Sequence, residues 1–297
     1  MSNIFEALQK SEAERSLNRQ ASSLPTELLR AAEQDAANFA PEPGEQTQAD
    51  LDHFPALKIV PLPNSKLLSL TDTESLAAEK FRFFGVRLRQ LQQIRAFKKV
   101  LITSSIPEEG KSMICANLAV ILARKKRQKV LLLEGDLRRP VLPARLGLGK
   151  VEGLSEWLQG DSQSIPNIYH LEGLNLWLLP AGHAPENPLE MMQSGRLQGL
   201  MEQLGGWFDW ILIDSPPVLP LADTSVWMRL ADGIILVARE GVTEKRELKR
   251  GLEVLEPSKL LGVVLNSSTE TDHSNYYQRY APSAADGNAK STNSLLE

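Results

Sequence analysis

Short, nearly continuous apolar runs alternate with longer helical stretches through the centre of the chain. Apolar runs without polar alternation predict strands that are covered on both faces, as in a parallel sheet. Strands that alternate with helices predict an α/β domain with a mostly parallel sheet and helices on both faces. The six runs lie at 100–102, 130–133, 176–179, 210–213, 233–237 and 261–265.

A helix is predicted at 74–95, before the first of these strands. Its apolar residues recur at helical spacing, and this spacing predicts one buried side. That side would carry Leu76, Phe81, Phe84, Leu88 and Leu91.

Both ends of the chain have a different composition from the centre. Residues 1–68 read as an N-terminal arm, with a short amphipathic segment at 1–20 and a Pro-rich polar linker at 36–66. Residues 271–297 are polar and predict a flexible tail. We therefore expect the folded domain to span 69–270.

Composition excludes several classes of protein. A single cysteine excludes a disulfide scaffold, and four scattered histidines argue against a structural zinc site. No apolar run approaches the roughly 18 residues that cross a bilayer, and the N-terminus lacks a secretory apolar core. The net charge of −4 equals that of the arm, because residues 1–68 hold six Lys/Arg and ten Asp/Glu. The neutral remainder is not typical of a nucleic-acid binder, and we expect a cytoplasmic protein.

The most specific local pattern follows the first predicted strand. The apolar strand leads into SSIPEEGKS, and an amphipathic helical stretch follows. Gly110, Lys111 and Ser112 match the end of the P-loop pattern G-x-x-x-x-G-K-[ST], while Ser105 stands at its first glycine. In such a loop, backbone amides and the lysine face phosphates, and the hydroxyl binds Mg²⁺. The alternative is an ordinary strand–turn–helix that carries GKS by chance.

Two acidic motifs follow the second and fourth predicted strands. Glu134 and Asp136 lie two residues apart on an extended segment, so their side chains point the same way. Asp214 ends an apolar run at the Walker B position, which places Mg²⁺ in P-loop enzymes. Open α/β sheets bind ligands at the carboxyl ends of their strands. With the P-loop, these residues predict a Mg-nucleotide site.

The three motifs together resemble those of the bacterial tyrosine kinases (BY-kinases), the P-loop autokinases of polysaccharide export of the CpsD/CapB type, most of all the exosortase-associated form. The resemblance covers about residues 74–280. It rests on TSSIPEEGKS, LEGDLRRP and ILIDSPP, with support from PENPLE, DGIILV and the N-terminal MSNIFEALQKSE. It implies a P-loop NTPase-like fold and phosphoryl transfer from Mg-ATP to tyrosine.

The resemblance also implies a role for each residue of the site. Lys111 would neutralise the phosphates, Asp136 would polarise the attacking phenol, and Glu134 would assist metal coordination. The metal itself would be held by Ser112, Asp136 and Asp214. The nucleotide would lie against Ser105, Glu109, Gly110, Lys111, Ser112, Met113 and the adenine-contacting Asn266.

Three of the four tyrosines, Tyr276, Tyr277 and Tyr280, lie in the polar tail. Tyrosine is depleted in such segments, so the cluster favours a function, with a short docking peptide as the alternative. The resemblance implies that these residues are phosphoacceptors presented to a neighbouring subunit. Arg138 or Arg139 would anchor the incoming tail. Each phosphate would add about −1.5 to −2 charges.

The chain departs from the family at three places. Glu134 stands where the family usually has aspartate, and its extra methylene predicts a shifted site and weakened activity. The subunit-contact motif E-x-x-R-x-x-R is incomplete: Glu79 and Arg82 match, but Gly85 holds the third position. The tyrosine cluster is also shorter than in many members. We therefore expect ring assembly to be less assured.

The resemblance implies partners as well: a membrane-anchored polysaccharide co-polymerase or chain-length activator, further copies of this chain, and a phosphotyrosine phosphatase. The activator would recruit the chain to the inner face of the plasma membrane. Two other functions stay open. One is an ATP-switched scaffold with weak catalysis. The other is a ParA/MinD-like ATPase, although Ile106 occupies the position of the signature lysine in that class.

Overall fold

A computed structural model of the 297-residue chain provides the structure. It describes residues 51, 53–62, 65–125, 127–160, 165–193 and 195–267. The expected amphipathic segment at 1–20 lies outside the described residues, and so do Tyr276, Tyr277 and Tyr280. The described residues from 53 onward belong to one compact unit.

The described residues contain one eight-stranded sheet with the order β1-β4-β5-β3-β6-β2-β7-β8. In the order of the sheet, the six strands β5-β3-β6-β2-β7-β8 are parallel to one another. β4 is antiparallel to β5, and β1 is parallel to β4. The strands are β1 Ala56–Leu57, β2 Lys99–Ser104, β3 Val130–Glu134, β4 Tyr169–Leu171, β5 Leu176–Leu179, β6 Trp210–Asp214, β7 Gly233–Arg239 and β8 Leu260–Asn266.

All six strands that the apolar runs predict are present, and the mostly parallel α/β fold is confirmed. β1 and β4 were not predicted, because two or three residues are too few to show a periodicity. β1 lies in the segment that we expected to be a linker, and it pairs with β4 through the register Ala56↔His170. Part of that segment is therefore built into the sheet.

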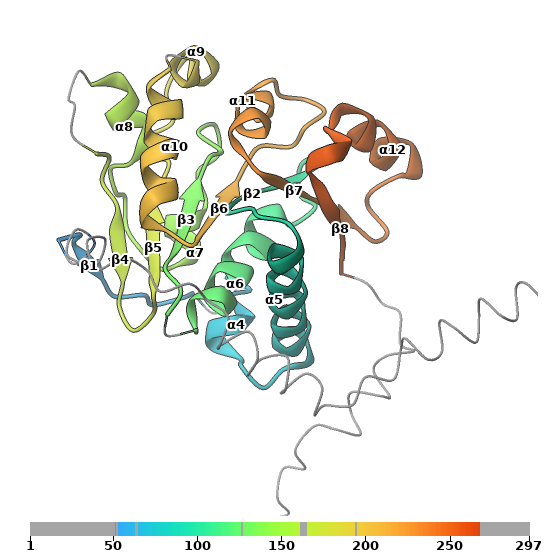
Figure 1. Ribbon diagram of the computed structural model, residues 1–297, viewed down its shortest axis with the longest axis horizontal. Coiled ribbons are helices and arrows are strands. Elements are labelled where there is room, and N and C mark those ends of the chain that lie inside the picture. The colour runs from blue at the N-terminus through green and yellow to red at the C-terminus, as the bar shows by residue number, and fades with distance from the viewer. Residues whose placement is uncertain are drawn as a thin grey trace, which may run out of the picture. The chain divides into compact units, whose positions relative to one another are not determined.

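The helices cover both faces of the sheet (Figure 1). The crossovers β5 to β6, β6 to β7 and β7 to β8 run in one direction along the sheet, and β2 to β3 runs in the other, so right-handed connections put their helices on opposite faces. The helices are α4 Leu68–Thr71, α5 Leu76–Ile94, α6 Lys111–Ala123, α7 Leu142–Arg145, α8 Leu154–Gln159, α9 Pro188–Met192, α10 Arg196–Trp207, α11 Asp223–Leu230, α12 Lys245–Val254 and a 3-10 turn, Pro257–Lys259.

The predicted first helix is α5, which begins after Ser75, whose side chain accepts a hydrogen bond from the amide of Ala78. Its buried side agrees with the prediction at Phe81 and Leu88, which are buried, and differs at its two ends. Leu76 and Leu91 are 39% and 38% exposed. The buried side instead includes Gly85, where an added Cβ would lie 2.8 Å from Cγ2 of Ile121 in α6. Close packing against α6 therefore determines which side of α5 is buried.

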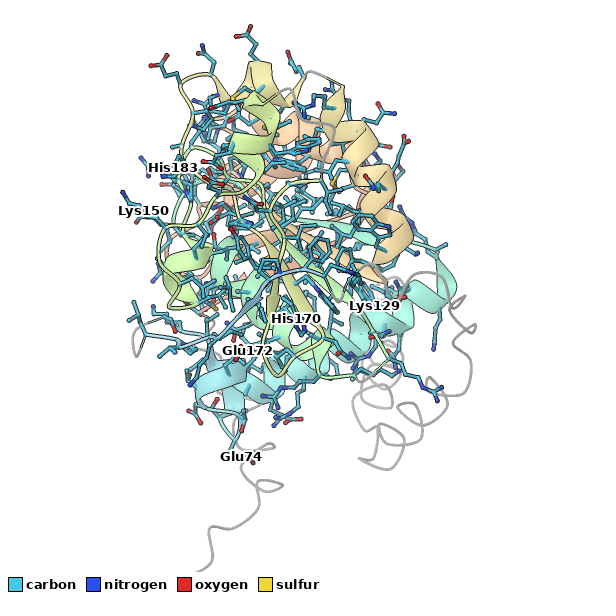
Figure 2. The ribbon with its side chains drawn as sticks, turned by 90° about the vertical axis from the view of Figure 1, so that its left-hand side faces the viewer. Glu74, Lys129, Lys150, His170, Glu172 and His183 are labelled. Atoms are coloured by element: carbon cyan, nitrogen blue, oxygen red, sulfur yellow. The ribbon has the colours of Figure 1, made fainter. Side chains whose placement is uncertain are left out.

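The parallel strands bring their carboxyl ends to one edge of the sheet. Figure 2 shows His183, which follows β5, toward the end of the molecule opposite Glu172 in the β4–β5 turn. The loop after β2 and the segments after β3 and β6 all lie at this edge. None of the described helices is long and apolar enough to cross a membrane.

Candidate active site

The P-loop joins β2 to α6 and is shaped by two residues with positive φ. Gly110 has φ of +94°, and a Cβ there would lie 2.2 Å from Nδ2 of Asn266, so only glycine fits. Glu108 adopts φ of +67°, which is strained for a residue with a side chain. Asn266 donates from Nδ2 to the carbonyl of Glu109 at 2.9 Å. The structure thus brings Asn266, at the end of β8, onto the phosphate loop.

The P-loop is braced from the side by the predicted Glu109 and by two residues that the sequence did not single out, Thr243 and Arg239. The buried carboxylate of Glu109 accepts from the amide of Ile106 at 2.8 Å and from the hydroxyl of Thr243. Arg239 donates from Nη1 to the carbonyl of Glu108 at 3.3 Å. Arg239 and Thr243 lie about 130 residues after the loop, and only the pairing of β7 with β2 brings them here. No local pattern could have revealed them.

Two other residues of the predicted nucleotide site have different surroundings. Ser105 is fully buried, and its hydroxyl has no hydrogen-bond partner among the described residues. It faces α12, since a Cβ on Gly251 would lie 2.3 Å from its Oγ. Met113 lies beside the loop, with Cε 3.9 Å from the position of a Cβ on Gly110. Met113 is thus beside the turn, and the side chain of Ser105 packs behind it.

Lys111, Asp136 and Asp214 form a charged cluster behind the P-loop. Nζ of Lys111 lies 3.3 Å from Oδ2 of Asp136 and 3.4 Å from the hydroxyl of Ser112. The other oxygen of Asp136 accepts from the amide of Arg139 at 3.1 Å. Asp214 is fully buried at the end of β6. The structure therefore brings together three of the residues that the sequence predicted.

Burial and mutual attraction control the charges of this cluster. Burial by itself lowers the pKa of Lys111, but the nearby Asp214 and Asp136 raise it above its usual value. Lys111 therefore stays a cation. Burial raises the pKa of Asp214, and Lys111 and the Ser112 hydroxyl offset part of that rise. The site is arranged to hold one positive charge among carboxylates.

The burial and the hydrogen bonding of Asp214 are those expected of a ligand-binding carboxylate. Neither of its oxygens has a hydrogen-bond partner of good geometry among the described residues, although the side chain is fully buried. An unsatisfied buried carboxylate is costly, and such a group calls for an explanation. The described residues contain no cluster of three His, Cys, Asp or Glu side chains that could hold a metal alone. Mg²⁺ is usually bound by one or two carboxylates together with substrate phosphates, and Asp214 with Ser112 fits that pattern.

Glu134 lies beside Asp214 in the register of β3 and β6, and its carboxylate is bound by backbone amides. Its carboxylate accepts from the amides of Val141 at 2.5 Å and Leu142 at 2.6 Å, and from Ala181 at 3.1 Å. Burial raises its pKa to about 7, although the three amides lower it. Within the described ranges, the hydrogen bonds of Glu134 thus lead to the backbone of two neighbouring loops.

The predicted anchor and oligomer residues are on the surface. Nε of Arg138 donates to Asp223 at 2.5 Å, and the side chain is 40% exposed. Arg139 is exposed. On α5, Nε of Arg82 donates to Glu79 at 2.6 Å, one turn away along the helix. The pair is therefore satisfied within one chain.

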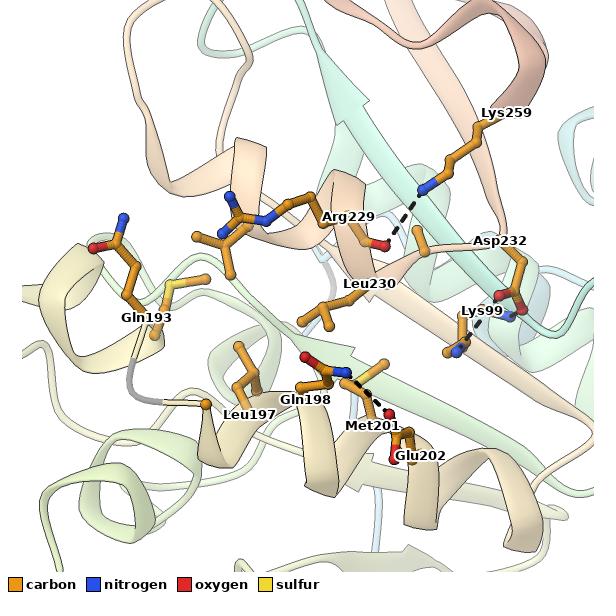
Figure 3. Close-up of a pocket in the computed structure, with 14 residues that line it drawn as sticks. Lys99, Gln193, Leu197, Gln198, Met201, Glu202, Arg229, Leu230, Asp232 and Lys259 are labelled. Atoms are coloured by element: carbon orange, nitrogen blue, oxygen red, sulfur yellow. Dashed lines mark hydrogen bonds and ion pairs between the residues drawn. The ribbon is translucent and has the colours of Figure 1, made fainter.

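A cavity of about 470 Å³ lies elsewhere, between α10 and α11 (Figure 3). Lys99 and Asp232, which form an ion pair at 3.5 Å, lie on its wall. These residues begin β2 and precede β7, so the cavity reaches the amino ends of those strands. Its lining contains none of the charged cluster, and it is not the site that the P-loop predicts.

Comparison with known sequences finds no matching family model but several relatives. The chain is 34% identical over 212 residues to the tyrosine-protein kinase YwqD of Bacillus subtilis, covering 71% of this chain and 89% of YwqD. It is 33% identical over 208 residues to the succinoglycan biosynthesis transport protein ExoP of Rhizobium meliloti. That match covers 68% of this chain but 26% of ExoP, so the chain spans about a quarter of the longer protein.

Solved structures agree with these relatives. The chimeric protein CapA2B2 shares 32% identity with a TM-score of 0.62, over 74% of this chain and 97% of that one. The kinase domain of the Escherichia coli tyrosine kinase ETK shares 27% identity with a TM-score of 0.59, over 67% and 79%. A P-loop at a parallel sheet, with a basic and acidic cluster behind it, is a nucleotide site. With nearly the full length of YwqD matched, the chain belongs to the family of bacterial tyrosine kinases.

Proposed function

We propose that this chain is a protein-tyrosine autokinase of polysaccharide export, which transfers the γ-phosphoryl group of Mg-ATP to Tyr276, Tyr277 and Tyr280 of a neighbouring copy. The observation that supports it most directly is the convergence of Lys111, Asp136 and Asp214 behind a P-loop, where neither oxygen of the buried Asp214 has a hydrogen-bond partner of good geometry among the described residues. Phosphoryl transfer depends mainly on positioning and charge neutralisation, and this cluster offers both.

The ammonium of Lys111 could exchange its ion pair with Asp136 for contacts to ATP phosphates. In the structure its ammonium lies 3.3 Å from Asp136. ATP phosphates would compete for that ammonium, which its raised pKa keeps charged. Asp136 would then be released to accept a proton. The ion pair thus links nucleotide binding to the availability of a base.

The bound metal would neutralise charge that develops on the phosphates. Ser112, Asp136 and Asp214 would hold it, and the buried, unpartnered oxygens of Asp214 support this assignment most strongly. In the transfer, the tyrosine oxygen forms a bond to the γ-phosphorus while the bond from that phosphorus to the β–γ bridging oxygen breaks. The phenol proton passes to Asp136, and ADP leaves.

Assembly and regulation extend the proposal. The similarity to ExoP, a succinoglycan biosynthesis transport protein, supports a role with a membrane-anchored polysaccharide co-polymerase. We propose three functional parts: the N-terminal arm at 1–68, the kinase domain at 69–270 and the tail at 271–297. Exposed Arg138 and Arg139 would anchor the incoming tail, and Glu79 and Arg82 would contact a neighbouring copy. A phosphatase would reset the tail.

Autophosphorylation tests this function directly. The purified chain is incubated with Mg-ATP, with and without a membrane activator, and phosphotyrosine is mapped by mass spectrometry. Lys111→Met should abolish the signal, while the exposed Lys150→Met serves as the matched control. Phosphate on the tail tyrosines that depends on Lys111 is the expected result. Nucleotide binding without any phosphotyrosine, even with the activator, would contradict the proposal and favour an ATP-switched scaffold.

A further inference from the structure

We propose that Glu134 is a positioning residue: its carboxylate ties together the two loops beside the catalytic cluster and does not ligate the metal. The first loop, at 135–140, carries Asp136 and is called the Asp136 arm. The second is the segment after β5 that begins at 180. The hydrogen bonds of Glu134 to both loops are called the clamp. This inference rests on the proposed phosphotransfer for its kinetic consequence, but its structural part stands on contacts alone.

The carboxylate of Glu134 joins the two ends of the Asp136 arm. The arm starts directly after Glu134, and the same side chain accepts from the amides of Val141 and Leu142, which directly follow the arm. The start of the arm is held separately, because the amide of Gly135 donates to the carbonyl of Asp214 at 2.7 Å. With both ends fixed, the arm has little freedom to move Asp136.

Contacts within the arm carry this restraint to Asp136. The indole of Trp227 donates to the carbonyl of Gly135 at 3.0 Å. An added Cβ on Gly135 would lie 2.6 Å from that ring, so the arm fits closely against α11. Asp136 accepts from the amide of Arg139 and lies 3.3 Å from Nζ of Lys111. The clamp therefore sets the position of the proposed base relative to the P-loop lysine.

The second oxygen of Glu134 reaches the other loop. It accepts from the amide of Ala181 at 3.1 Å. The carbonyls of Pro180 and Ala181 in turn accept from Leu154 and Ser155, both at 2.9 Å, at the start of α8. One side chain thus joins the arm, the exit of β5 and α8. The PENPLE motif follows this exit, so the clamp also orders the segment that leads to it.

The length of glutamate is what makes this clamp possible. Replacement by aspartate would withdraw the carboxylate by about one carbon–carbon bond, roughly 1.5 Å. Amides now at 2.5 to 3.1 Å would then lie beyond the range of a hydrogen bond. An ionised carboxylate has about four acceptor positions, and three amides already use most of them. The extra methylene therefore lets the carboxylate reach the three amides, and Asp214 and its neighbours would bind the metal.

Amide hydrogen exchange combined with kinetics tests the clamp. Glu134→Asp should speed exchange at Val141, Leu142 and Ala181 by about tenfold or more, because their acceptor is lost. It should lower kcat by about 10²-fold, as expected when a catalytic group shifts by about 1 Å. The ATP affinity and the half-saturating Mg²⁺ concentration should stay within about twofold of the wild type. Glu172→Asp, in the exposed β4–β5 turn toward the opposite end of the molecule from His183, is the matched control (Figure 2).

Glu134→Gln provides the second variant. Its amide oxygen can still accept from Val141 and Leu142, but its NH₂ group cannot accept from Ala181. Exchange should therefore rise at Ala181 alone, with a smaller loss of kcat. If the aspartate variant fails to fold, the same readouts on Glu134→Gln decide.

Two outcomes would overturn the proposal. A half-saturating Mg²⁺ concentration that rises about tenfold in either variant, with amide exchange unchanged, would make Glu134 a metal ligand. Unchanged exchange and unchanged kcat in both variants would remove any positioning role. If the wild type transfers no phosphate, the proposed function fails, but the exchange data still support or refute the clamp.

Discussion

The ends of β3 and β6 carry two carboxylates that differ in their hydrogen-bond partners. Glu134 and Asp214 are partners in the parallel register of the two strands, and both are fully buried. Glu134 accepts three backbone hydrogen bonds, whereas neither oxygen of Asp214 has a hydrogen-bond partner of good geometry among the described residues. The first carboxylate is satisfied by its own chain. The described residues leave both oxygens of the second without such a bond, and this difference is why we propose a structural role for Glu134 and a catalytic one for Asp214.

The largest effect is expected from Asp214→Asn, measured as the rate of phosphotransfer. We expect a loss of roughly 10²–10³-fold, the range for removing one preorganised electrostatic group. The melting temperature should stay the same or rise, because a buried carboxylate without a hydrogen bond of good geometry among the described residues costs free energy. Asp72→Asn, at an exposed position, should change neither quantity. A fall in stability with retained activity would reverse the comparison.

Unfolding by urea distinguishes the two carboxylates by stability. Glu134→Ala leaves three amides without their acceptor, and each such loss costs roughly 1–3 kcal/mol, so we expect at least about 3 kcal/mol in total. Asp214→Ala should cost clearly less, because it breaks no hydrogen bond of good geometry within the described residues. Equal losses for the two variants would show that Asp214 is as structural as Glu134.

Glu156 extends the comparison to a partly exposed carboxylate. Burial raises its pKa, but the amides of His183 and Gly153 and the ring of His183 outweigh burial, so the pKa lies below its usual 4.5. A lowered pKa in the folded state stabilises the fold above about pH 4.5, and this stabilisation is lost as pH falls through the folded value. The melting temperature of Glu156→Gln should therefore approach that of the wild type in acid. A constant difference from pH 3 to 7 would contradict this; Glu172→Gln is the control.

The smallest effect is expected at Glu108 in the P-loop. Its positive φ costs about 1–2 kcal/mol for a residue with a side chain. Glycine removes that strain but gains about 0.4–1 kcal/mol of freedom in the unfolded chain. Glu108→Gly should therefore raise the free energy of unfolding by roughly 0.5 kcal/mol, measured in urea. Glu74→Gly, at an exposed site, is the control, and an unstable Glu108→Gly variant would show that the strain is not released.

Much of the site followed from the sequence because its motifs are local. Gly110, Lys111 and Ser112 share one turn, and Asp214 ends an apolar run. The carboxyl ends of parallel strands meet at one edge, so these residues had to lie near one another. Residues 1–20 and the tail tyrosines stay predictions, because they lie outside the described residues.

The role of Glu134 could not be predicted in the same way. The spacing to Asp136 suggested two acids facing one site, but the contacts of Glu134 lie with amides seven, eight and 47 positions away. The same holds for Thr243 and Arg239, which brace the P-loop from β7 and the segment after it. Backbone amides carry no sequence signal, so their partners emerge only when strands and loops are placed.

The sequence by itself determined the sheet, the phosphate loop and the acids at its edge, because apolar periodicity and short motifs act over a few neighbouring residues. Tertiary structure decided which acid is free. Strand pairing put Glu134 beside Asp214, and within the described part of the chain loop packing supplied amides to the first and none to the second. The physical reason is that a carboxylate's state depends on the donors around it in space, and residues distant in the chain provide them.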